Sequence, residues 1–110
     1  MPKLTDQVRT EIRTKFAGRD DIEVIKHPRY DDQAVARPPT DGEYRIFRQK
    51  LASPEEAALA NDMLIDACVL WPDKDAREKL FGQRPALRDV WAGEIIEMAG
   101  ATRQATREKL

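Results

Sequence analysis

The sequence has 110 residues, of which 41% are hydrophobic and 35% are charged, as expected for one globular domain and not for a disordered chain. Its 19 basic and 20 acidic residues give a net charge of -1, which argues against a general polyanion binder because phosphate contacts need a concentrated positive field. No apolar run approaches the length of a membrane span, and charge interrupts the N-terminus throughout, so we expect a cytoplasmic protein without a membrane partner.

Residues 1–18 are predicted to form an N-terminal helix. Leu4, Val8, Ile12 and Phe16 recur at every fourth position, which places them on one narrow stripe of a helix. Gly18 is predicted to end this helix. A stripe one residue wide predicts that only one side of this helix is covered, either by its own domain or by a second copy of the chain.

Residues 20–38 are predicted to form a two-stranded antiparallel hairpin. Ile22, Val24 and Ile25 favour a strand, "HPRYDD" supplies turn residues, and "QAVARP" allows a second short strand. Pro38 and Pro39 cannot donate to a ladder and therefore end it. Such a hairpin is marginal alone, so we expect it to pack on helices.

Residues 40–100 are predicted to form a helical body that opens with two helix starts. Thr40 and Glu43 have the spacing of a capping box. "SPEE" repeats that pattern, with Ser53 as the cap of a long helix that runs to Trp71 and ends at Pro72.

Two further helices are predicted beyond Pro72. Asp73 caps a short one that stops at Gly82, and Pro85 starts the last one, which ends near Gly100. Residues 101–110 form a polar tail. The fold class is therefore α+β: a single, mostly helical domain with four or five helices and a short hairpin near the N-terminus.

Candidate catalytic and metal-binding residues are few. His27 is the single histidine and lies in the predicted turn, where no nucleophile or orienting carboxylate is indicated. Cys68, the single cysteine, falls on an apolar helix face, as a buried free thiol does. We find no phosphate loop and no metal-ligand spacing, so we expect no catalytic residue, no metal and no cofactor.

An alternative function is that of a small DNA-binding regulator of the helix-turn-helix type, formed by "WPDKDAREKLFGQRPALRDVW". The would-be recognition helix opens with a proline and mixes Asp89 and Glu94 with its arginines, which is poor chemistry for the major groove. We therefore do not expect nucleic acid as the partner. A small enzyme is the third and weakest alternative.

Three segments, "ARPPTDGEYRIFRQKL", "DACVLWPDKDAREKLFGQRPAL" and "AGEIIEMAG", resemble small tail-assembly chaperones of tailed bacteriophages. The resemblance covers about residues 35–100. It is carried by an Arg-x-Pro-Thr segment before a Tyr/Phe helix, an aromatic-Pro pair, an Arg-Pro step and a final Ala-Gly. The matching residues are Arg37, Pro39, Thr40, Tyr44, Phe47, Trp71, Pro72, Arg84, Pro85 and Gly100.

The resemblance implies a non-enzymatic assembly factor, in a phage or prophage, that binds an aggregation-prone helical protein such as the tape-measure protein. It also implies self-association as a homo-oligomer and no cofactor. Binding of this kind needs an apolar face with a polar rim. As partner-binding residues we predict a set on the helix after the Pro-Pro pair and near the two tryptophans: Tyr44, Phe47, Arg48, Leu51, Trp71 and Trp91.

Overall fold

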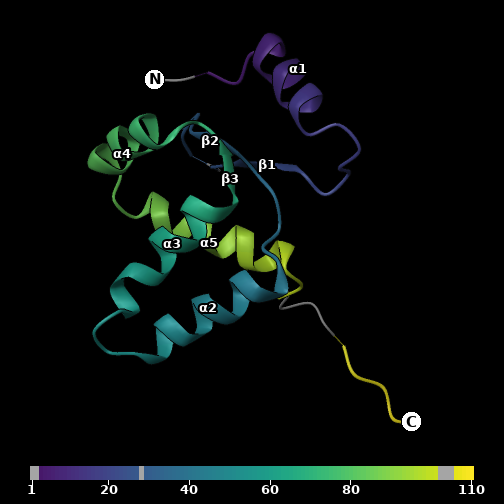
Figure 1. Ribbon diagram of the computed structural model, residues 1–110, viewed down its shortest axis with the longest axis vertical. Helices are drawn as coiled ribbons and strands as arrows, with labels where there is room; N and C mark the ends of the chain where they lie inside the picture. Colours follow the sequence, from purple (N-terminus) through teal and green to yellow (C-terminus); the bar gives the residue numbers. More distant parts are fainter. Residues whose placement is uncertain (1–2, 28, 102–105) are drawn as a thin grey trace.

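The computed structural model describes residues 3–27, 29–101 and 106–110. Its elements, in chain order, are α1 (Asp6–Lys15), β1 (Glu23–Lys26), β2 (Gln33–Ala36), α2 (Asp41–Ala52), the 3-10 turn η1 (Ala57–Leu59), α3 (Ala60–Cys68), β3 (Val69–Trp71), α4 (Lys74–Gln83) and α5 (Leu87–Met98). The α+β class and the N-terminal hairpin are confirmed. Figure 1 shows the sheet between α1 on one side and α3, α5 and α2 on the other.

The sheet has three antiparallel strands in the order β1-β2-β3, one strand more than the predicted hairpin. The prediction of helix up to Trp71 was wrong, because α3 ends at Cys68 and the β-favouring residues Val69–Trp71 pair with β2. A register shift opposite Val35 and Ala36 places Val69 beside Ala36 and Trp71 beside Val35. Directly opposed residues share a sheet face, so Val69 and Trp71 lie on opposite faces.

The two faces of the sheet have different surroundings. Ile25, Ala34, Ala36 and Val69 point toward the helices and belong to the main core. The cross-strand row Val24, Val35 and Trp71 lies on the outer face, away from the main core, and Val24 and Val35 share a hollow with residues of α1. Val35 is buried but does not belong to the main core cluster, which indicates that it is covered from this outer side.

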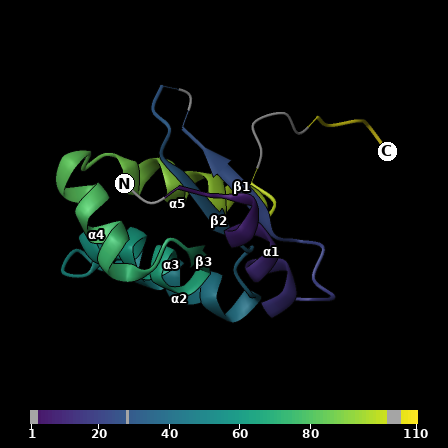
Figure 2. The same ribbon diagram turned by 90° about the horizontal axis from the view of Figure 1, so that it is seen from above.

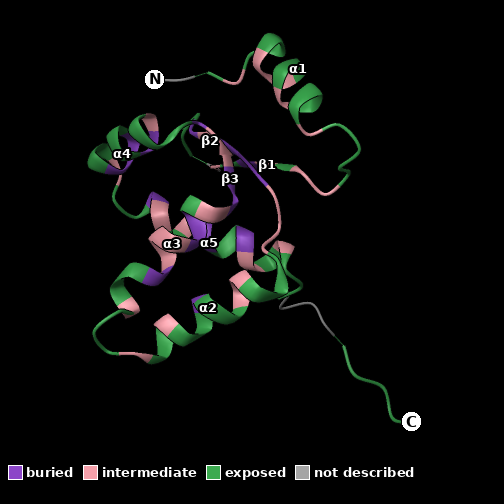
Figure 3. Ribbon diagram, viewed as in Figure 1, coloured by how far each residue is buried: buried purple, intermediate pink, exposed green. Residues whose placement is uncertain are grey.

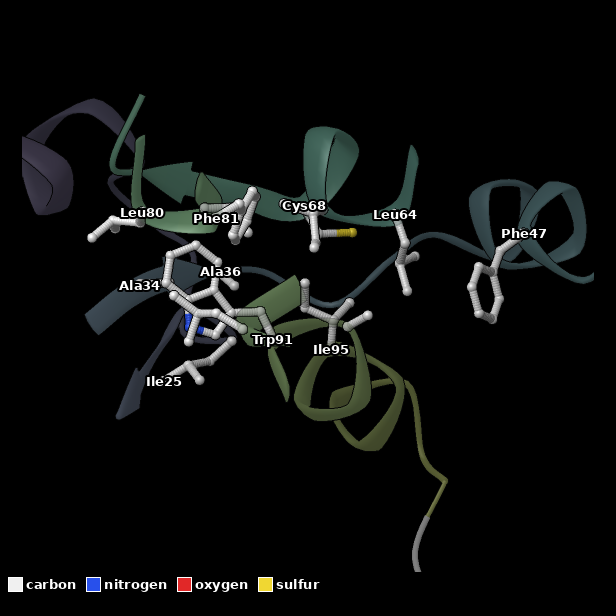
Figure 4. Packing of buried hydrophobic residues seen from close by; sticks show 14 of the residues in the cluster. Ile25, Ala34, Ala36, Phe47, Leu64, Cys68, Leu80, Phe81, Trp91 and Ile95 are labelled. Carbon is white, nitrogen blue, oxygen red and sulfur yellow. The ribbon is translucent and has the colours of Figure 1, made fainter. Parts of the chain in front are cut away.

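The main core lies where α3 and α5 cross beneath the sheet. Trp91 is fully buried and meets Phe81 edge-to-face, with ring centroids 5.3 Å apart and an interplanar angle of 68°. Figure 4 shows Ile25, Ala34 and Ile95 around the same ring, and Phe47 of α2 at the far end of the cluster. Buried residues therefore come from the strands and from α2 to α5, and α1 contributes none (Figure 3).

Several predicted helix boundaries are confirmed and others are corrected. Thr40 and Glu43 form the capping box, and Asp73 accepts from the Ala76 amide as the cap of α4. Ser53 does not begin a helix: it ends α2, and its carbonyl accepts from the Glu56 and Ala57 amides in a turn, so α3 begins only at Ala60.

The later boundaries differ by a few residues. The helix α4 continues through Gly82 to Gln83, and α5 begins at Leu87, two residues after Pro85. Of the predicted polar tail, residues 102–105 lie outside the described residues, and residues 106–110 are exposed and form neither helix nor strand.

Arg37, which directly follows β2, joins α2 to α3. Its guanidinium binds Glu43 through two hydrogen bonds of 2.8 and 2.9 Å and donates to the Ala67 carbonyl at 2.6 Å. The same Glu43 carboxylate accepts from the Thr40 amide. The Arg37 guanidinium, together with the Thr40 amide, lowers the pKa of Glu43 from 4.5 to about 2.

The Arg37–Glu43 pair predicts a pH-dependent part of the stability. Because the pKa of Glu43 is lowered on folding, the pair stabilises fully above about pH 4.5 and loses its effect as the pH falls toward 2. We expect Glu43→Gln to lower the free energy of unfolding by about 1–3 kcal/mol at pH 7. Urea titrations at several pH values measure the difference in free energy of unfolding between Glu43→Gln and wild type, which should shrink toward pH 2. A difference that does not change with pH would show that the charge on Glu43 does not contribute to stability.

Candidate protein-binding groove

An apolar groove lies between α1 and the outer face of the sheet. The volume of this groove is about 340 Å³. We call it the α1 groove, and its apolar lining consists of Ile12, Phe16, Ala17, Ile22, Val24 and Val35. Seen from above, α1 crosses beside β1 (Figure 2).

Local sequence signals fix where α1 begins and where the chain turns from it toward the sheet, so that α1 forms one wall of the groove. Thr5 caps the helix by accepting from the Val8 amide at 3.2 Å. Gly18 has a φ of +90°, a left-handed conformation that glycine adopts without strain, and it turns the chain toward β1. The predicted stripe Leu4, Val8, Ile12 and Phe16 is half-buried along its whole length. The helix thus covers the sheet but leaves part of its own apolar stripe accessible.

The rim of the groove on the α1 side is basic. Arg9 and Arg13 line it one helical turn apart, at positions that differ by about 40° around the helix axis. Among the residues with described positions, neither has an ion-pair partner. Arg19 also lines the groove but is paired with Asp21 at 2.6 Å. Glu23 lines the β1 side.

The structure separates the six predicted partner-binding residues. Two of the predictions need correction, since Phe47 and Trp91 are buried in the main core, where neither is accessible to a partner. Tyr44 is half-buried, with its ring 6.0 Å from that of Phe47, and packs against the core. Trp71 is half-buried on the outer sheet face, beside Val35.

Arg48 and Leu51 are both exposed on α2, and Leu51 lies one turn after the buried Phe47 on the same side of the helix. Leu51 is 49% exposed and Ile46 is 48% exposed. These two side chains lie five residues apart and therefore point about 140° away from each other around the helix. Exposed apolar residues that are scattered singly are normal on a protein surface. The α1 groove, which gathers its apolar side chains in one hollow, is therefore the stronger candidate site.

The residues that a helix-turn-helix motif would use to bind DNA have other roles in this structure. Arg84 is 2.8 Å from Asp32, and Arg88 is 3.0 Å from Asp62 and 3.6 Å from Glu78. The helix α5 buries Leu87, Trp91, Ala92 and Ile95. A helix that supplies the centre of the core, with arginines already paired to carboxylates, has little left to place in a major groove.

The two candidate reactive side chains lie apart from the groove lining. Nδ1 of His27 accepts from the Arg29 amide at 3.0 Å and the Tyr30 amide at 3.3 Å, so this imidazole orders the hairpin turn. Cys68 is buried, and burial raises the pKa of its thiol to about 11, which suppresses the reactive thiolate. Within the described ranges, no three His, Cys, Asp or Glu side chains are placed to hold a metal ion.

Comparison with known proteins gives a fold and no family. No family model matches the sequence, and no curated protein matches it. A solved structure of an uncharacterised protein from Bacillus stearothermophilus superposes with a TM-score of 0.73 at 18% identity, over 91% of this chain and 99% of that chain. This similarity confirms the α+β architecture. In the described part of the chain, no helix is both long enough and apolar enough to span a bilayer.

None of the six predicted partner-binding residues lines the α1 groove, although part of the signal for the groove was present in the sequence. The single-residue stripe of Leu4 to Phe16 indicated a helix with a second surface beside it. Val24 and Val35 occupy alternating positions in their strands, which is the pattern of a sheet with two covered faces. Trp71 joins that face only through β3, which the sequence pattern had assigned to a helix.

Proposed function

We propose that this protein is a non-enzymatic tail-assembly chaperone of a phage or prophage, which shields an amphipathic helical segment of a tail protein in the host cytoplasm. The partner is of the tape-measure type, long, helical and prone to aggregate. The observation that carries the proposal is the α1 groove, with an apolar floor and a polar rim. Helix-in-groove binding uses that combination, because one apolar helix face replaces water in the groove.

Two further features support this proposal. The resemblance in residues 35–100 concerns the helical body, and the groove is built by the N-terminal segment that packs on that body. Shielding requires binding only, and neither His27 nor Cys68 lines the α1 groove. Self-association belongs to the proposal as well: we expect light scattering to give a mass above the 12.6 kDa of one chain.

A charge placed on the groove floor should abolish chaperone activity. We expect Ile12→Asp to remove most of the protection that the full-length protein gives to an aggregating tape-measure-type helical protein, because an aspartate in the groove must stay hydrated. Light scattering of the client over time measures this protection. The fold should survive, since α1 contributes no fully buried residue to the core.

The matched control is Thr10→Asp, which adds the same charge to the exposed side of α1, about 160° from Ile12. It should protect like wild type. Equal protection by wild type, Ile12→Asp and Thr10→Asp would show that the α1 groove does not bind the client.

A further inference from the structure

We infer that the helix bound in the α1 groove is acidic along one flank, with carboxylates one turn apart that pair with Arg9 and Arg13. This inference rests on the proposed function and specifies the chemistry of the partner. The inference concerns the edge of the groove that α1 forms. There, the guanidinium groups of Arg9 and Arg13 lie beside the apolar stripe of the helix.

The spacing of the two arginines sets the spacing expected in the partner. Residues i and i+4 lie about 6 Å apart along a helix axis. A helix laid along α1 therefore meets both guanidinium groups if it carries Asp or Glu at positions three or four apart. Glu23 on the β1 side disfavours a second acidic row, so the opposite flank of the partner is neutral or basic.

Charge also argues against two segments of a second copy as occupants, the α1 helix and the end of the chain. Between Asp6 and Lys15, α1 has three basic residues (Arg9, Arg13, Lys15) and two acidic ones (Asp6, Glu11). The end of the chain adds Arg107 and Lys109 against Glu108. Both segments thus have an excess of positive charge and are poorly suited to a basic rim. Nucleic acid would match the charge but would leave the apolar floor unpaired.

The test uses the full-length protein and three labelled peptides of about 18 residues, long enough to form a helix. All three have the same leucine stripe, and one flank carries Glu, Gln or Lys at matched positions one turn apart. Fluorescence anisotropy gives the affinities. We expect the Glu peptide to bind about tenfold more tightly than the Gln peptide, from two exposed ion pairs, and the Lys peptide to bind most weakly. Salt should reduce the preference.

A pair of double variants locates the effect. Arg9→Gln/Arg13→Gln should bind the Glu and Gln peptides equally, whereas Arg45→Gln/Arg48→Gln, the same charge change on α2, should keep the wild-type preference. Equal binding of the Glu and Lys peptides to wild type overturns the inference and leaves helix binding standing. Loss of preference in the α2 variant, or a short DNA duplex displacing the Glu peptide, also overturns it. No binding of any peptide contradicts the proposed function itself.

Discussion

Replacing Trp91 with alanine is expected to lower the free energy of unfolding by about 3–5 kcal/mol, the range for removal of a large aromatic side chain from a core. Trp91 is completely buried, and it packs edge-to-face on Phe81. Figure 4 shows strand residues on one side of its ring and Ile95 close by, so no single element can move in to fill the space. Urea unfolding followed by circular dichroism measures the loss.

The other tryptophan provides the control for this experiment. Trp71 is half-buried on the outer sheet face, where part of its ring already contacts water. Trp71→Ala should therefore cost only about 1–2 kcal/mol, because less apolar area returns to water. Equal losses for the two variants would contradict the placement of Trp91 at the centre of the core.

Replacing Arg84 with methionine is also expected to cost about 3–5 kcal/mol, because the change leaves a buried charge without its partner. The Asp32 side chain is completely enclosed, and its carboxylate lies 2.8 Å from Nη1 of Arg84. Among the described residues, neither carboxylate oxygen has a donor aligned for a hydrogen bond, so the positive charge of Arg84 is its main compensation. Arg84 also covers the Tyr30 ring at 4.2 Å.

A double variant separates loss of charge from loss of packing. In Asp32→Asn/Arg84→Met the buried group is neutral, so most of the lost stability should return, as happens when both members of a buried pair are replaced together. Chemical unfolding of the wild type, both single variants and the double variant gives the coupling. A double variant as unstable as Arg84→Met would mean that packing on Tyr30, and not the ion pair, holds the hairpin on the helices.

Local signals in the sequence account for much of the fold. The Thr40–Glu43 capping box and the Asp73 cap are satisfied by neighbours within three residues, so their outcome does not depend on tertiary structure. Ser53 and Pro54 have the same local chemistry as a helix start, but the chain turns there and α3 starts at Ala60. Val69–Trp71 became a strand because β2 offered a free edge, which no local pattern records.

The candidate site was harder to predict, for a related reason. The same helical spacing described Phe47, which is buried, and Leu51, which is half-exposed at the end of α2. Whether an aromatic side chain is buried depends on the elements that cover it. Trp91 on α5 is covered by α3 and the sheet, whereas Trp71 lies in the strand at the edge of the sheet. Periodicity identifies an apolar face but does not identify its partner.

The central claim is that an amphipathic helix binds between α1 and the outer face of the sheet. Amide chemical-shift mapping of the isotope-labelled protein, titrated with the Glu-flanked peptide, tests it most directly. We predict saturable shifts centred on Ile12, Phe16, Val24 and Val35, with α2 unaffected. Shifts confined to α2 around Arg48 and Leu51, or no shift in the α1 groove at saturating peptide, would contradict this account.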